Sequence, residues 1–100
     1  MRTIEIITPE GQATYRADSV WAVEKAKSLQ ENRSGFRLLF SYEPYSAELR
    51  LQPDAAEKLY LSVRAFLKSD VDEELIIQPH GDGLVSIQTI RKTIRKTIRK

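Results

Sequence analysis

Hydrophobic and polar residues alternate with a period of two in several parts of the chain, which is the pattern of a half-buried β-strand. These segments come in three pairs, each separated by turn-forming residues: 3–8 with 13–17, 36–42 with 47–51, and 75–77 with 84–88. Two alternating segments joined by a short Gly- or Pro-containing turn are typical of a β-hairpin. The pattern therefore predicts three hairpins.

A helical period is found between the first two hairpins. Ala22, Val23, Ala26 and Leu29 follow the i, i+3, i+4, i+7 spacing of one helix face. Asp18 or Ser19 can cap such a helix at its start, and Gly35 is a suitable stop after Arg33. This spacing predicts a first helix that ends near Arg33.

The strongest helical pattern follows the second hairpin and begins at Pro53 and Asp54. Seven apolar residues fall within an arc of about 140° on a helical projection; they are Ala55, Ala56, Leu59, Tyr60, Val63, Phe66 and Leu67. Asp54 and Glu57 have the spacing of a capping box. Leu61 lies outside the apolar arc, beside the charged residues. We therefore predict a second helix from about residue 54 to residue 68.

Together these elements predict an α+β fold with three β-hairpins and two helices in a loose ββα-ββα-ββ order. A chain of 100 residues is the right size for one domain. We expect a single α+β domain at residues 1–88, with a largely antiparallel sheet that carries the helices on one face.

Residues 89–100 form a separate feature, because the sequence Thr-Ile-Arg-Lys is repeated there three times without change. In a helix, a four-residue repeat advances by about 400°, so the Ile residues form one stripe and the cations lie across from it. Half of the residues are β-branched and the segment is short, so it should be frayed or disordered when free. We predict a basic C-terminal tail that becomes a third helix only when its Ile stripe is packed.

The charge of the chain is unevenly distributed. Sixteen Lys and Arg against 14 Asp and Glu give a net charge of +2, but residues 1–90 carry −4 and residues 91–100 carry +6. Six cations on ten residues can neutralise several nucleic-acid phosphates without reading sequence; they are Arg91, Lys92, Arg95, Lys96, Arg99 and Lys100. Nonspecific nucleic-acid binding through this tail is the first functional hypothesis, against the alternative that the tail is a solvated, duplicated or engineered extension.

A second hypothesis is a protein-interaction module, either an adaptor or an inhibitor, or a homo-oligomer, which uses the folded body. Trp21, Tyr45 and Leu61 are the candidate contacts, because aromatic and large apolar residues dominate interface energetics. Core packing is the alternative role for each of them. Binding to a membrane surface is less favoured, since three Ile residues without Trp or Phe make a weak anchor.

Catalysis has the least support in the sequence. The single His, His80, lies with Asp82 in a Gly-rich stretch that is more typical of a hairpin turn than of an acid–base pair or a metal site. No Cys is present, which excludes disulfides and thiolate chemistry. We expect a non-enzymatic protein without cofactor or metal and, with no apolar run long enough for a membrane span or a signal, a cytoplasmic location.

Overall fold

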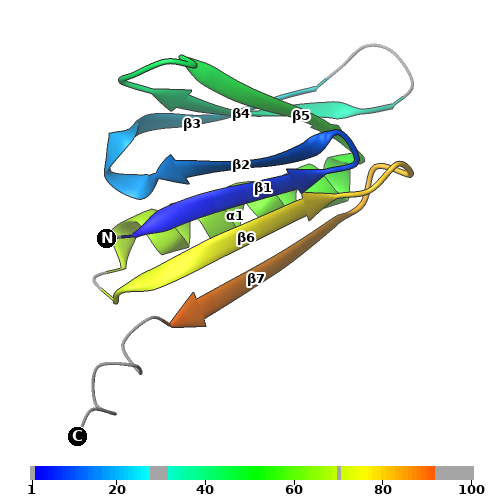
Figure 1. Cartoon of the computed structure of the whole chain (residues 1–100). Coiled ribbons are helices and arrows are strands. Elements are labelled where there is room, and N and C mark those ends of the chain that lie inside the picture. Colours follow the sequence, from blue (N-terminus) through cyan, green and yellow to red (C-terminus); the bar gives the residue numbers. More distant parts are fainter. Residues whose placement is uncertain (1, 28–31, 70, 92–100) are drawn as a thin grey trace, which may run out of the picture.

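The computed structural model describes residues 2–27, 32–69 and 71–91 (Figure 1). In these residues the elements are β1 (Thr3–Thr8), β2 (Gly11–Arg16), the 3-10 turn η1 (Ala17–Ser19), β3 (Val20–Lys27), β4 (Ser34–Phe40), β5 (Ser46–Leu51), α1 (Pro53–Lys68), β6 (Glu73–Pro79) and β7 (Val85–Arg91). The predicted α+β class is confirmed.

The strands form two sheets rather than the single predicted one. One sheet has the order β2-β1-β6-β7 and the other has the order β3-β4-β5. All pairs are antiparallel except β1 with β6, in which Ile4 lies opposite Leu75. Because β1 and β6 are far apart in the sequence, no local sequence pattern predicts their pairing.

The three predicted hairpins are present as β1–β2, β4–β5 and β6–β7. Their alternation has the expected cause. In β4, for example, Phe36, Leu38 and Phe40 point into the core and are buried, whereas Arg37 is exposed between them. The second strand of the third hairpin, β7, continues to Arg91.

The second predicted helix is confirmed as α1, and its apolar arc faces the core. Leu59 and Val63 are fully buried, and Leu61 is 54% exposed, as its position outside the arc indicates. The predicted capping box is wrong. The helix begins at Pro53, and its N-cap is Gln52, whose side chain makes no capping hydrogen bond. Pro suits this position because its missing N–H would have had no helical partner.

The first predicted helix is wrong in the described residues, because Val20–Lys27 is strand β3. It follows that the ββα repeat is also wrong: the order in the first half is strand, strand, 3-10 turn, strand. Ala22 pairs with Leu39 and Ala26 with Gly35, so Gly35 is a strand residue and not a helix stop. Ala22 and Ala26, whose spacing resembles one face of a helix, are here cross-strand partners of β4 residues. Residues 28–31 of that prediction lie outside the described residues.

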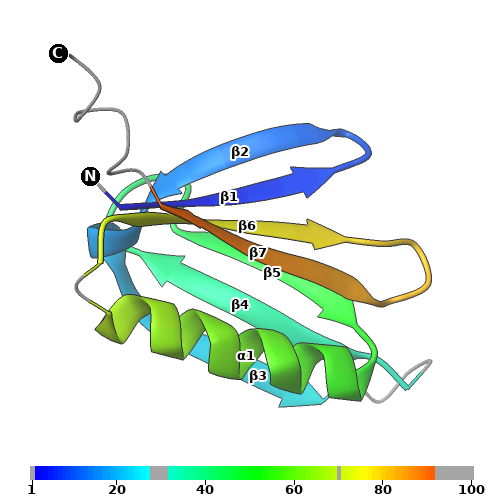
Figure 2. The same cartoon turned by 90° about the horizontal axis from the view of Figure 1, so that it is seen from below.

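The core lies between the inner faces of the two sheets, and α1 covers the side where β3 and β7 would otherwise be open (Figure 2). Ile4 and Ile77 from one sheet and Phe36 and Leu51 from the other belong to the same buried cluster as the helix residues. One helix thus completes a core for which the sequence predicted two helices.

The tail boundary predicted at residue 89 falls inside β7, since Thr89, Ile90 and Arg91 pair with β6. The first Thr-Ile-Arg part of the repeat is therefore strand. The remainder of the predicted tail, residues 92–100, with its possible third helix, lies outside the described residues.

Candidate interaction surface

Trp21 occupies a β-bulge in β3. Val20 pairs with Phe40 and Ala22 pairs with Leu39, so Trp21 is the extra residue between two consecutive pairs. A bulge of this kind bends a strand and turns a side chain away from its regular direction. The indole Nε1 donates a hydrogen bond to the carbonyl oxygen of Phe40 at 3.3 Å, while the side chain remains 69% exposed. The ring is therefore held in place with its polar group satisfied and its apolar surface facing solvent.

Two adjacent hollows lie on the outer side of α1, and they connect Trp21 with Leu61. The first has a volume of about 240 Å³ and is lined by Trp21, Val23 and Leu67 together with Arg64 and Lys68. The second, of about 320 Å³, is lined by Leu61, Arg64, Ala65 and Lys68. Because the two hollows share Arg64 and Lys68, they form one continuous surface. We call it the Trp21–Leu61 surface and define it by Trp21, Leu61, Arg64, Leu67 and Lys68.

The Trp21–Leu61 surface carries positive charge although residues 1–90 are net negative. Arg64 donates a long hydrogen bond of 3.4 Å to the Tyr60 hydroxyl and lies 5.4 Å from the centre of that ring. In the part of the chain that the structure describes, neither Arg64 nor Lys68 forms an ion pair. Its cations are thus available to a carboxylate of a partner.

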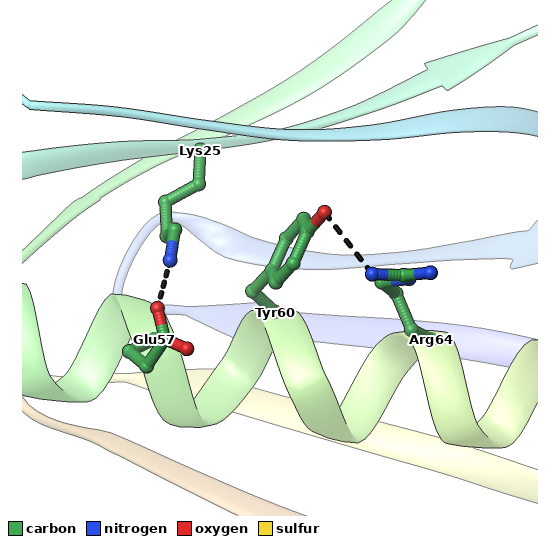
Figure 3. A network of polar contacts seen from close by, with 4 residues as sticks. All are labelled: Lys25, Glu57, Tyr60 and Arg64. Atoms are coloured by element: carbon green, nitrogen blue, oxygen red, sulfur yellow. Dashed lines mark hydrogen bonds and ion pairs between the residues drawn. The ribbon is translucent and has the colours of Figure 1, made fainter.

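The ring of Tyr60 fixes one side of this arrangement (Figure 3). Lys25, on β3, forms an ion pair with Glu57 and also lies 4.9 Å from the centre of the Tyr60 ring. Tyr60 therefore stands between two cations, and each gains a cation–π contact of about 0.5–1 kcal/mol at such an exposed site.

The structure brings two of the three predicted interaction residues together and leaves the third apart. Trp21 and Leu61 lie in neighbouring hollows of the same surface. Tyr45 is 67% exposed in the turn between β4 and β5, but it lines neither hollow. Its backbone carbonyl accepts a hydrogen bond from the Phe40 N–H at 2.8 Å. The turn is thus joined to β4, whose Phe40 carbonyl also accepts the hydrogen bond of the Trp21 indole.

Sequence reasoning missed the cations of this surface, although a signal for them was present. Leu61, Arg64, Ala65 and Lys68 have the i, i+3, i+4, i+7 spacing of a second helix face, opposite the apolar one. A mixed basic and apolar stripe on an exposed helix face indicates a contact surface more specifically than one exposed Leu does.

Of the six predicted nucleic-acid contacts, the structure describes Arg91 alone. Its guanidinium is exposed at the end of β7, and its Nε lies 3.8 Å from a carboxylate oxygen of Glu73. This ion pair joins the end of β7 to the start of β6. Lys92, Arg95, Lys96, Arg99 and Lys100 lie outside the described residues.

The residues of the β6–β7 turn are used for the turn itself. The His80 N–H donates to the Leu84 carbonyl at 2.9 Å, and an Asp82 carboxylate oxygen accepts from the Leu84 N–H at 3.0 Å. The His80 Nε2 lies 2.8 Å from the Ser86 hydroxyl. These contacts support the turn interpretation of residues 79–83. Among residues 2–27, 32–69 and 71–91, no three side chains of the types that ligate metals are grouped together.

Comparison of the chain with family models, curated proteins and solved structures gives no match. In the described residues no helix is both long enough and apolar enough to cross a membrane.

Proposed function

We propose that this protein is a non-enzymatic binding module that recognises another protein through the Trp21–Leu61 surface. The observation that carries the proposal is a Trp that the fold holds 69% exposed by a bulge and a hydrogen bond, next to two cations without carboxylate partners. Trp and Arg are the residues most enriched at the energetic centres of interfaces. An ordered, exposed indole also loses little conformational entropy when a partner covers it.

The chemistry of the surface selects the kind of partner. The hollows offer apolar contact through Trp21, Leu61 and Leu67, and charge through Arg64 and Lys68. A complementary segment presents one or two large apolar side chains flanked by Asp or Glu. Such a segment fits because the charged pairs would lie at the rim, where they raise the association rate and select the partner, while the apolar side chains supply the affinity.

The test is the selection of peptides from a displayed library of random short sequences. We expect enriched peptides that combine acidic and large apolar residues. Trp21 is the only Trp of the chain, so its emission should shift to the blue as a peptide covers the ring. Replacing a central Trp at an interface costs about 2–4 kcal/mol, so Trp21→Ser should weaken binding by roughly 30- to 1,000-fold.

Two further variants make this test specific. Lys68→Glu should weaken binding and reduce its dependence on salt, since it reverses a charge that meets the acidic residues of the peptide. Tyr45→Ser is the matched control, because Tyr45 is about as exposed as Trp21 but lies outside the hollows. The peptide affinity of this variant should stay within about twofold of that of the original protein, as is usual for residues outside an interface core. Peptides that bind Trp21→Ser as tightly as the original protein would show that the surface is not the binding site.

A second candidate function, nucleic-acid binding through residues 91–100, rests on the +6 charge of that segment. If all six cations contact duplex phosphates, log K should fall with log salt with a slope of about −5. The comparison is between the full chain and a chain that stops after Arg91, which keeps β7 complete. Equal binding by both chains, or binding that salt does not weaken, would contradict this function.

A further inference from the structure

A groove lies between the two sheets on the side away from α1. It has a volume of about 390 Å³ and is bounded by the β1–β2 hairpin on one side and by β5 on the other. Both β2 and β5 are edge strands of their sheets. The groove therefore lies where the edges of the two sheets are not hydrogen-bonded to each other, whereas α1 covers the opposite side of the core.

Among the residues that the structure describes, the outer edge of β2 has backbone groups without a hydrogen-bond partner. The N–H of Arg16 donates to the Tyr42 hydroxyl at 3.0 Å and so points away from β1. Successive N–H groups of a strand point alternately to its two sides. Thr14 and Gln12 therefore direct their N–H and C=O groups to the same open edge as Arg16, while Ala13 and Tyr15 between them direct theirs to β1.

On the other side of the groove, the backbone groups of β5 also alternate between its partner strand and its outer edge. The N–H of Gln52, which follows β5, donates to the Gly83 carbonyl at 2.8 Å. The N–H of Phe40 donates to the Tyr45 carbonyl, which places the hydrogen-bonded pairs of β4 and β5 at odd-numbered residues of β5. Glu48 thus directs its backbone groups to the open edge. Gly83 closes one end of this edge, and within residues 2–27, 32–69 and 71–91 no backbone group pairs with its middle.

The lining of the groove defines what could occupy it. Its floor is apolar, with Ile6, Tyr15 and Leu49 among its residues, and the ring of Tyr15 is stacked on Phe40 with 4.5 Å between the centroids. Its charged lining residues are Glu10 and Glu48, and neither forms an ion pair in the part of the chain that the structure describes. An apolar floor with an acidic rim fits an extended segment in which apolar residues alternate with Lys or Arg.

We infer that this groove accepts an extended basic segment of another protein as an additional strand on the edge of β2. Backbone hydrogen bonds to Gln12 and Thr14 hold the segment, its alternate apolar side chains contact the floor, and its cations meet Glu10 and Glu48 at the rim. This strand addition satisfies an edge that is otherwise open to nonspecific pairing. The inference concerns a different surface from the Trp21–Leu61 surface and does not depend on it.

The probe for this site is a short synthetic peptide in which Val alternates with Lys, labelled for fluorescence anisotropy. A scrambled peptide of the same composition, with its Val residues grouped together, is the matched control. The alternating peptide should bind and the scrambled one should not, because only alternation places every Val on one face of a strand. The charge reversals Glu10→Lys and Glu48→Lys, combined, should weaken binding by about tenfold or more. Asp18→Lys changes the charge by +2 outside the groove, as each of the two substitutions does within it, and should have no effect.

Amide hydrogen exchange distinguishes strand addition from binding through side chains alone. In the free full-length protein the amides of Gln12 and Thr14 should exchange fast, and saturation with the peptide should slow them by about tenfold or more. The amides of Ala13 and Tyr15 already bond to β1 and should change less. Slow exchange at Thr14 before any peptide is added would mean that a second copy or another segment of this chain fills the edge, and it would overturn the inference. Binding without protection of Thr14, or equal binding of the scrambled peptide, would overturn it as well.

Discussion

Gly83 connects the β6–β7 turn to the start of α1, and its replacement by Ala is a sensitive test of the structure. Gly83 is buried and has a φ of 90°, a conformation that side-chain-bearing residues rarely adopt. Its carbonyl accepts the Gln52 N–H, and its own N–H donates to the His80 carbonyl at 3.0 Å. A Cβ at this position would lie 2.9 Å from the Gln52 Cγ and 3.1 Å from the Arg33 Cζ.

The cost of Gly83→Ala has two parts. A left-handed backbone costs an L-residue about 1–2 kcal/mol relative to Gly. The added methyl group must also displace the side chains of Gln52 and Arg33, and overpacking of this kind costs about 1–3 kcal/mol, with the lower end expected here because both side chains are flexible. We therefore expect a loss of roughly 2–4 kcal/mol in the free energy of unfolding and, for a domain of this size, a fall in Tm of roughly 10–25 °C.

Urea unfolding followed by circular dichroism measures this loss, and Gly81→Ala is its control. Gly81 lies in the same turn, has no positive φ, and would place its Cβ more than 4 Å from any other group. Its replacement should raise the free energy of unfolding by less than about 1 kcal/mol, because Ala restricts the unfolded chain. Equal unfolding midpoints for the two variants would refute the proposed packing of the turn against the start of α1.

Three further substitutions test other parts of the structure. Phe36→Ala removes a fully buried ring from the centre of β4 and should cost about 3–5 kcal/mol in urea unfolding. Arg2→Met removes hydrogen bonds to the carbonyls of Phe66 and Val71 but keeps an apolar contact with the Phe66 ring. The free energy of unfolding should fall by about 1–2 kcal/mol. An unchanged value would contradict the contribution of these hydrogen bonds between Arg2 and the end of α1. Lys25→Met breaks an exposed ion pair, so thermal unfolding should show a change below about 1 kcal/mol that disappears in high salt.

The elements that could be predicted from the sequence are those whose pattern is local. The alternation of Phe36, Leu38 and Phe40 fits only a strand, and the broad apolar arc around Leu59 and Val63 fits only a helix. In β3, by contrast, the residues that follow a helical spacing are mostly Ala, which suits either structure. There the pairing with β4 decides the outcome, because tertiary contacts outweigh small differences in propensity.

The candidate sites show the same limit. Trp21 was singled out as a candidate contact because it is aromatic. Its observed exposure comes from a bulge, which no sequence pattern indicated. The stripe that places Leu61 beside Arg64 was readable because helix periodicity is local. The groove between β2 and β5 was not, since it depends on how hairpins from different parts of the chain are placed against one another.

The parallel pair of β1 and β6 has a consequence for the order in which the protein can fold. Thr3 is paired with Glu74, so β1 obtains its second neighbour from a segment about 70 residues further along the chain, and contacts of such long range slow folding. On the ribosome, the β1–β2 hairpin would have to wait, with one side of β1 uncovered, until β6 has been synthesised. The later β6 therefore shields one side of β1, and a nascent chain interrupted before β6 would expose an unpaired β-branched edge for chaperones or proteases to recognise.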